Sequence, residues 1–217
     1  MSSASERRQK ILDEIAAVAR VAKRDPADVH LIAVSKTRSE DEIEALIEAG
    51  QRDFGESRVQ EAIAKWPALL GRNRDIRLHC IGRLQSNKAA EAVSLFDVIH
   101  SVDRPSLLQA LVEAKKPGKT PSVYVQVNIG EEEQKGGCAI DGIGELVAAV
   151  RASPLPLAGL MAIPPLGPEP APFFALLAEL ARRHDVSGLS MGMSGDFRSA
   201  VMLGATAVRV GTALFDD

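Results

Sequence analysis

The chain has 217 residues, of which 46% are hydrophobic, 25% are charged and 4% are aromatic, and its formal net charge is -3. This size and composition predict one soluble globular domain over 1–217, while the charge and the few aromatic side chains speak against a nucleic-acid partner or a membrane surface. The first ten residues are too polar for a secretory signal, and no apolar run is long enough for a membrane span. We therefore expect a cytoplasmic protein.

Helices and strands alternate along the chain. Apolar residues at helical spacing predict a helix over 4–23, and a buried strand over 30–35 follows. Ser39 and Glu42 have the spacing of a capping box that begins the next helix, and Gly50 is placed to end it. The remaining expected elements are a strand at 53–57, a helix at 57–70, a strand at 76–82, a helix within 84–96, a strand at 97–102, a helix at 104–116, a strand at 123–129, a helix at 142–153, a strand at 157–163, a helix at 171–184, a strand at 188–194, a short helix at 196–204 and a strand at 207–214.

The strands are apolar on both faces and are separated by helices, which is typical of a parallel sheet. Eight of them predict a single (β/α)8 TIM barrel, here with an extra N-terminal helix. The alternative is an open doubly wound sheet, but no GxGxxG motif follows the first strand. Two cysteines far apart in the sequence, Cys80 and Cys138, give no disulfide framework or zinc motif, and we expect no metal.

The strongest functional pattern lies after the seventh and eighth strands. Ser194 and Gly195 stand where a helix begins, and Gly211 and Thr212 follow the core of the last strand. In TIM barrels these two loops commonly bind phosphate, because small residues let an anion approach backbone N–H groups. The alternative is ordinary turn chemistry. The pattern favours a phosphorylated ligand.

Lys36 interrupts a buried strand at its C-terminal end, where barrel active sites lie. It shares a face with Ile32 and Val34. If that face lines the barrel, the amine points into the mouth and can form a Schiff base; otherwise it is a solvated strand end. A Schiff-base lysine near a phosphate site indicates a phosphorylated aldehyde, either pyridoxal 5′-phosphate (PLP) or the sugar phosphate of an aldolase.

Arg209 lies inside an apolar strand, where an unpaired charge is costly. It has two possible partners, a carboxylate or the pyridine nitrogen of a PLP cofactor. In the second case a permanent cation would hold that nitrogen unprotonated and make the ring a weak electron sink.

Seven segments together resemble the pyridoxal-phosphate homeostasis protein family, whose fold is like the barrel domain of alanine racemases. They are AVSKT (33–37), FGESRVQE (54–61), HCIGRLQSNK (79–88), VNIGEEEQKGG (127–137), GLMAIPP (159–165), SMGMSGDF (190–197) and GATAVRVGTALF (204–215). They follow one another from the first strand to the C-terminus, which makes the set specific.

The resemblance implies that Lys36 carries PLP as a Schiff base. It also implies that Arg209 faces the pyridine nitrogen and that Met191 and Asn128 lie near the cofactor. The implied phosphate contacts are Ser190, Ser194, Gly195, Gly211 and Thr212. The family usually has FGENY where this chain has FGESR and HFIGHLQ where it has HCIGRLQ. No cofactor contact is therefore expected at Ser57, and His79 fits a core histidine as well as a ligand-side group.

The resemblance leaves two possibilities, an enzyme or a carrier. Racemisation needs two bases, and in full racemases a separate β-domain supplies the second as a tyrosine. This chain ends just after the eighth strand, and its one tyrosine, Tyr124, lies early in the fifth. We therefore expect no catalytic residues. The expected protein is a monomer that holds PLP and takes part in PLP homeostasis, with PLP-dependent apo-enzymes as transient acceptors. The alternative is a PLP-dependent racemase or decarboxylase.

Overall fold

The strands close into a barrel. In a computed structural model that describes residues 2–216, parallel strands pair in chain order from β1 to β8, and β8 pairs with β1. The strands are β1 His30–Val34, β2 Asp53–Glu56, β3 Arg77–Cys80, β4 Val98–Val102, β5 Ser122–Gln126, β6 Leu157–Met161, β7 Leu189–Met193 and β8 Ala207–Val210. The closure confirms the predicted (β/α)8 barrel, and the open sheet is wrong.

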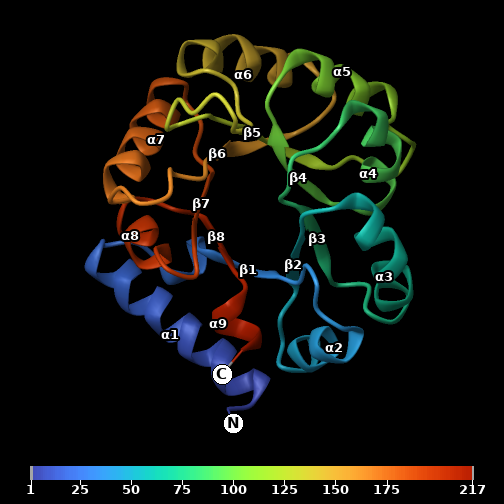
Figure 1. The fold of residues 1–217 in the computed structure, drawn as a ribbon, viewed down its shortest axis with the longest axis vertical. Helices are drawn as coiled ribbons and strands as arrows, with labels where there is room; N and C mark the ends of the chain where they lie inside the picture. The colour runs from blue at the N-terminus through green and yellow to red at the C-terminus, as the bar shows by residue number, and fades with distance from the viewer. Residues whose placement is uncertain (1, 217) are drawn as a thin grey trace.

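Helices surround this barrel (Figure 1). They are α1 Ala4–Val21, α2 Glu40–Glu48, α3 Val59–Arg72, α4 Ala89–Leu95, α5 Pro105–Glu113, α6 Ile143–Ala152, α7 Ala171–Arg183, α8 Phe197–Met202 and α9 Thr212–Phe215. The predicted extra helix is α1, which packs against α8 and α9, so the two ends of the chain lie near each other. Within residues 2–216, every helix is too short or too polar to cross a membrane.

Local signals place the ends of α2. Ser39 accepts a hydrogen bond from the Glu42 amide, and the Glu42 carboxylate accepts one from the Ser39 amide, which confirms the capping box. Gly50 has a φ of +88°, a left-handed conformation that few other residues adopt, and it ends the helix as predicted. A second capping box, Ser3 with Glu6, begins α1.

The last predicted strand is too long. β8 ends at Val210, and Thr212–Phe215 forms the short helix α9. The backbone leaves the extended region at Gly211, and the Leu214 amide donates to the Gly211 carbonyl at 2.8 Å. A run of a few apolar residues fits a strand or a helix equally well, because it is too short to show a period. The strand predicted at 123–129 ends earlier, at Gln126, and Val127 forms an isolated bridge with Cys138.

The apolar core fills the space between the sheet and the helices. The largest buried side chain is Trp66 of α3, whose ring lies 5.1 Å from the ring of Phe54 on β2. Polar side chains are also buried among the strands, and four of them are His79, His100, Ser190 and Arg209. Their hydrogen bonds, described below, account for their burial.

Candidate functional site

A pocket of about 330 Å³ opens where the strands end, on the side of the barrel that active sites of this fold use. Its lining residues are Val34, Lys36, Ser57, Ile81, Ile163, Met193, Ser194, Gly195, Arg209, Gly211 and Thr212. The fold thus brings the predicted lysine, the predicted phosphate loops and the buried arginine to one cavity. We call this end of the barrel the mouth.

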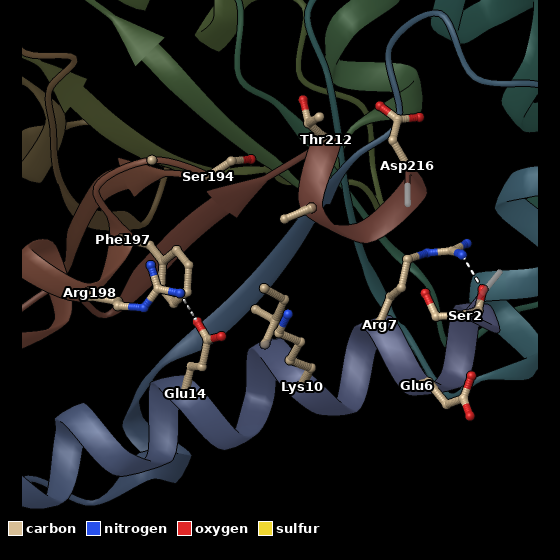
Figure 2. Close-up of a pocket in the computed structure, with 13 residues that line it drawn as sticks. Ser2, Glu6, Arg7, Lys10, Glu14, Ser194, Phe197, Arg198, Thr212 and Asp216 are labelled. Atoms are coloured by element: carbon tan, nitrogen blue, oxygen red, sulfur yellow. Dashed lines mark hydrogen bonds and ion pairs between the residues drawn. The ribbon is translucent and has the colours of Figure 1, made fainter.

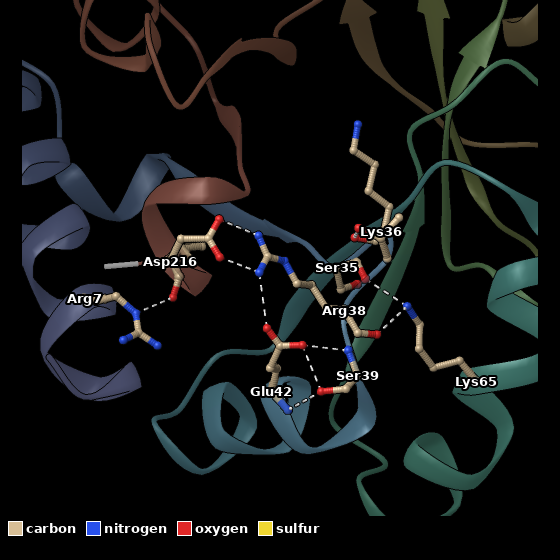
Figure 3. A network of polar contacts seen from close by, with 10 residues as sticks. Arg7, Ser35, Lys36, Arg38, Ser39, Glu42, Lys65 and Asp216 are labelled. Atoms are coloured by element: carbon tan, nitrogen blue, oxygen red, sulfur yellow. Dashed lines mark hydrogen bonds and ion pairs between the residues drawn. The ribbon is translucent and has the colours of Figure 1, made fainter. Parts of the chain in front are cut away.

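Lys36 lies two residues after the end of β1, and its side chain is exposed. Within residues 2–216, its ammonium has no hydrogen-bond or ion-pair partner. Figure 3 shows the side chain extending away from the polar network beneath it. A lysine at a pocket wall without a partner is free to react with a carbonyl group.

A buried ion pair holds the backbone just before Lys36. The Glu56 carboxylate accepts hydrogen bonds from the Ser35 hydroxyl at 2.8 Å and the Trp66 indole at 2.9 Å. Lys65 lies 2.8 Å from the same carboxylate and also donates to the Ser35 carbonyl at 2.8 Å. These contacts fix the position from which the Lys36 side chain starts.

The residue after Lys36 has an unusual backbone. Thr37 has a φ of +63°, which is costly for a β-branched residue. Its amide donates to the Glu61 carboxylate at 2.6 Å, and its hydroxyl donates to the Lys36 carbonyl at 2.6 Å. The turn is therefore held from both sides, and Lys36 stands between two fixed residues.

The C-terminal segment is tied to the same region (Figure 3). Arg38 pairs with both carboxylate oxygens of Asp216, at 2.5 and 2.7 Å, and with Glu42 at 3.2 Å. Arg7 of α1 donates to the Leu214 carbonyl at 2.8 Å. The loop after β1, α2, α9 and α1 are thereby joined around one side of the mouth.

The phosphate-type loops adjoin β1 in the pocket lining, since β8 pairs with β1. The Ser194 hydroxyl accepts a hydrogen bond from the Gly211 amide at 3.2 Å, which joins the loops after β7 and β8. At Gly195 an added Cβ would meet no atom within 4 Å, so the backbone there is open to a ligand. Thr212 begins α9 beside it. Such small residues suit an anion that binds through backbone groups.

Arg209 is only 3% exposed, yet it lines the pocket. Its Nη1 donates to the Ser190 hydroxyl at 2.6 Å and its Nη2 donates to the Ala162 carbonyl at 3.1 Å. No carboxylate of residues 2–216 forms an ion pair with it, so the alternative of a carboxylate partner is not observed. Burial lowers the pKa of Arg209 to about 10, which leaves it cationic at neutral pH.

Three predicted residues do not line the pocket. Ser190 and Met191 are fully buried within β7. The Ser190 hydroxyl lies 2.8 Å from His100 Nδ1 and 2.6 Å from Arg209 Nη1. The Asn128 side chain closes a turn with the backbone of Glu132, at 3.0 and 3.2 Å. Direct ligand contact is not supported for these side chains, because they lie within a strand or a turn rather than at the pocket wall.

Sequence reasoning missed several lining residues, among them Ser57, Ile81, Ile163 and Met193. Each lies at or just after the C-terminal end of a strand, which is the signal that could have found them. The sequence predicts no cofactor contact at Ser57, because the segment departs from the family pattern, yet the structure places Ser57 in the pocket lining.

A second cleft, of about 590 Å³, lies between α1, α8 and α9 (Figure 2). It shares Ser194, Gly195 and Thr212 with the mouth. Its charged residues have both signs: Arg198 pairs with Glu14 at 2.5 Å, and other acidic and basic side chains of α1, together with Asp216 after α9, line it. This mixture favours no class of ligand.

Comparison with known proteins places this chain in a family. Residues 8–217 match the family model described as alanine racemase, N-terminal domain. The pyridoxal phosphate homeostasis protein of Pseudomonas aeruginosa is 41% identical over 222 residues, which cover 99% of this chain and 96% of that protein. Its counterpart in Escherichia coli is 38% identical over 219 residues, covering 95% and 93%.

Comparison with solved structures agrees with this family. PipY of Synechococcus elongatus, solved with PLP bound, is 41% identical with a TM-score of 0.79 and covers 93% of this chain and 99% of its own. Alanine racemase of Bacillus anthracis is 15% identical with a TM-score of 0.64; the match covers 94% of this chain but 55% of the racemase, so it shows the fold alone. The chain therefore belongs to the pyridoxal phosphate homeostasis protein family and has the barrel fold of the alanine racemase N-terminal domain.

Proposed function

We propose that the protein binds pyridoxal 5′-phosphate at the mouth, with Lys36 as the Schiff-base lysine, and takes part in PLP homeostasis. The observation that carries this proposal is one pocket lined by an unpaired lysine, a phosphate-type cradle and a buried arginine. The residues fit the cofactor, because an amine, an anion site and a cation are the groups that its aldehyde, phosphate and pyridine nitrogen require. Relatives named for this cofactor support it.

Each lining residue has a proposed role. Lys36 holds the aldehyde carbon, and Ser194, Gly195, Gly211 and Thr212 bind the phosphate. Arg209 donates to the pyridine nitrogen. When bound, PLP supplies an electron-withdrawing ring, and a cationic partner that cannot accept a proton keeps that ring a weak electron sink. Met191 and Asn128 act near the cofactor by shaping the backbone around it, and Ser190 acts through Arg209.

We propose that this binding is not catalytic. The single tyrosine, Tyr124, stacks on His100 with ring centroids 4.4 Å apart and lines a cleft at the opposite end of the barrel with His30. It therefore cannot act as a second base at the mouth. The racemase-like fold makes racemase or decarboxylase activity the second candidate. We expect no racemisation or decarboxylation of amino acids by the loaded protein, and turnover above that of free PLP would favour the second candidate.

We also propose that 1–217 acts as one monomeric domain that passes PLP to PLP-dependent apo-enzymes. The exposed position of Lys36 supports this, because an incoming amine can reach a carbonyl carbon held there. Loaded protein is expected to activate an apo-enzyme in the presence of a scavenger of free PLP. Failure to do so would leave release into solution as the route. Sedimentation of the loaded protein tests the monomer.

The decisive experiment is reduction with borohydride followed by peptide mass spectrometry. We expect a pyridoxyl group on Lys36 and none in Lys36→Arg. Lys88→Arg and Lys135→Arg are matched controls, because each is a lysine paired with a nearby glutamate, and both should leave the labelling of Lys36 unchanged. An unlabelled Lys36 after incubation with PLP would overturn the proposal. A sugar-phosphate Schiff base, the aldolase alternative, would leave the protein colourless.

A further inference from the structure

A row of hydrogen-bonded side chains runs from the pocket into the barrel. Arg209 Nη1 lies 2.6 Å from the Ser190 hydroxyl, which lies 2.8 Å from His100 Nδ1. His100 Nε2 lies 2.9 Å from His79 Nδ1, and His79 Nε2 lies 2.9 Å from Asp53 Oδ1. Asp53 is the first residue of β2, so the row ends at the opposite end of the barrel from the mouth. We call these residues the relay.

The relay crosses the barrel interior. Ser190 lies on β7 and His100 on β4, and these strands are not neighbours in the sheet, so their contact passes through the lumen. Both side chains are fully buried, and His79 is nearly so. In such a place a polar atom that loses its partner keeps the full cost of its burial. At the end away from the mouth, Asp53 is partly exposed and pairs with Arg77 at 2.8 Å.

The direction of every hydrogen bond in the relay is determined by its two ends. A guanidinium only donates and a carboxylate only accepts. Ser190 therefore accepts from Arg209, and Asp53 accepts from His79 Nε2–H. When both rings are neutral, His79 Nδ1 then accepts from His100 Nε2–H, and His100 Nδ1 accepts from the Ser190 hydroxyl.

The charges around the histidines agree with this arrangement. Burial lowers the pKa of His100 well below its ordinary value, and His79 and Arg209 beside it act in the same direction. Burial also lowers the pKa of His79, against the opposing effect of Asp53. Both rings are therefore neutral at neutral pH, each in one tautomer.

We propose that Asp53, His79, His100 and Ser190 are positioning residues for Arg209. The one Ser190 proton is donated to His100 Nδ1, so the hydroxyl presents only its lone pairs to Arg209, and His100 Nδ1 can accept that proton only while the rest of the relay keeps this direction. A carboxylate that does not touch Arg209 thus sets the orientation in which the guanidinium faces the mouth. The consequence for PLP rests on the proposed function, since Arg209 faces the cofactor there.

The first test needs no cofactor. Long-range 1H–15N spectra of the histidine rings should show His79 and His100 as neutral Nε2–H tautomers at neutral pH. The Arg209 Nη nitrogens should give resolved signals, because their rotation is blocked, and these signals should merge in Ser190→Ala. An imidazolium, an Nδ1–H tautomer, or Arg209 signals that Ser190→Ala leaves unchanged would overturn the relay.

The second test measures PLP affinity by absorbance titration. Ser190→Ala and Asp53→Ala should each weaken binding by about tenfold, since each removes a hydrogen bond that involves a charged group. Ser190→Thr keeps the hydroxyl and should bind nearly as the parent does.

Ser101→Ala is the matched control. Ser101 neighbours His100 on β4, is fully buried, and has a hydroxyl with no hydrogen-bond partner within residues 2–216. It should lower stability less than Ser190→Ala does, because its hydroxyl has no hydrogen bond to lose, and it should leave PLP affinity unchanged. Equal affinities for Ser190→Ala and Ser101→Ala, with Lys36 still labelled by borohydride, would overturn the relay and leave the proposed function intact. If borohydride reduction does not label Lys36 in the parent protein, the proposed function is wrong. The histidine tautomers and the Arg209 signals alone then test the relay.

Discussion

The mouth and the interior of the barrel treat polar groups in opposite ways. At the mouth, the Lys36 ammonium has no partner in the described part of the chain, and the backbone at Gly195 faces open space. In the interior, both nitrogens of His79 and of His100 are hydrogen-bonded. An unpaired polar group costs little where water can reach it and much where water cannot. The comparison teaches that a reactive group such as Lys36 belongs at the mouth, and that the hydrogen-bonded side chains supporting the site belong in the interior.

Two residues join these regions. Arg209 lines the pocket and begins the relay, while Glu56 is fully buried beneath the segment that carries Lys36. One oxygen of Glu56, Oε2, is buried without a hydrogen-bond partner within residues 2–216. A substitution in either region should have the effect that its surroundings determine.

The largest expected effect belongs to the buried ion pair. Glu56→Gln should lower the free energy of unfolding by about 3 kcal/mol, because it removes the buried carboxylate charge 2.8 Å from the Lys65 ammonium and leaves only Glu61, at 3.5 Å, to pair with it. Urea denaturation measures the loss. Glu179→Gln removes an exposed carboxylate that pairs with Arg182 and should change stability little. Equal losses for the two variants would show that Glu56 does not behave as an interior group.

Substitutions at two glycines should affect stability and PLP binding separately. Gly192 has a φ of +92°, and an added Cβ would lie 2.5 Å from the Ala200 Cβ, so Gly192→Ala should cost about 2 kcal/mol of stability. Gly195→Ala adds a methyl group in open space at the mouth, so it should leave thermal unfolding nearly unchanged but weaken PLP binding. A loss of stability in Gly195→Ala would contradict the distinction between the mouth and the interior.

The buried histidines predict how stability depends on pH. Because burial holds the pKa of His79 and His100 below the ordinary value of 6.5, the unfolded chain binds protons before the folded one does. Stability should be constant above that value and fall as pH drops below it, by up to about 1.4 kcal/mol per pH unit for each histidine. Urea denaturation over this window measures the slope. His79→Asn should reduce the slope and His30→Asn, on an exposed residue, should not; equal slopes would contradict the assignment.

The smallest effect concerns the thiols. Burial raises the pKa of Cys80 to about 12 and that of Cys138 to about 11, so few thiolates exist at neutral pH. Iodoacetamide should label Cys138, which is half-buried, slowly, and should label Cys80 only after unfolding. Mass spectrometry of the labelled peptides distinguishes the two. Labelling of Cys80 in the folded protein would show that the interior opens to solvent.

The sequence alone determined the barrel and much of the mouth. The alternation of helices and strands, the capping box at Ser39 and the stop at Gly50 are local patterns, so they can be seen without knowing the fold. Lys36 and the glycine-rich loops stand at strand ends, and the barrel rule alone brings strand ends together. That is why the sequence placed these residues at one pocket.

The tertiary structure decided the rest. Whether the chain after Val210 continues as a strand depends on packing that a short apolar run does not reveal. The role of Ser190 depends on Arg209 and on His100, which is 90 positions away in the sequence. Strand register and the crossing of the lumen set such contacts, and no local pattern encodes them. Residues far apart in the chain therefore acquire their function only when the barrel closes.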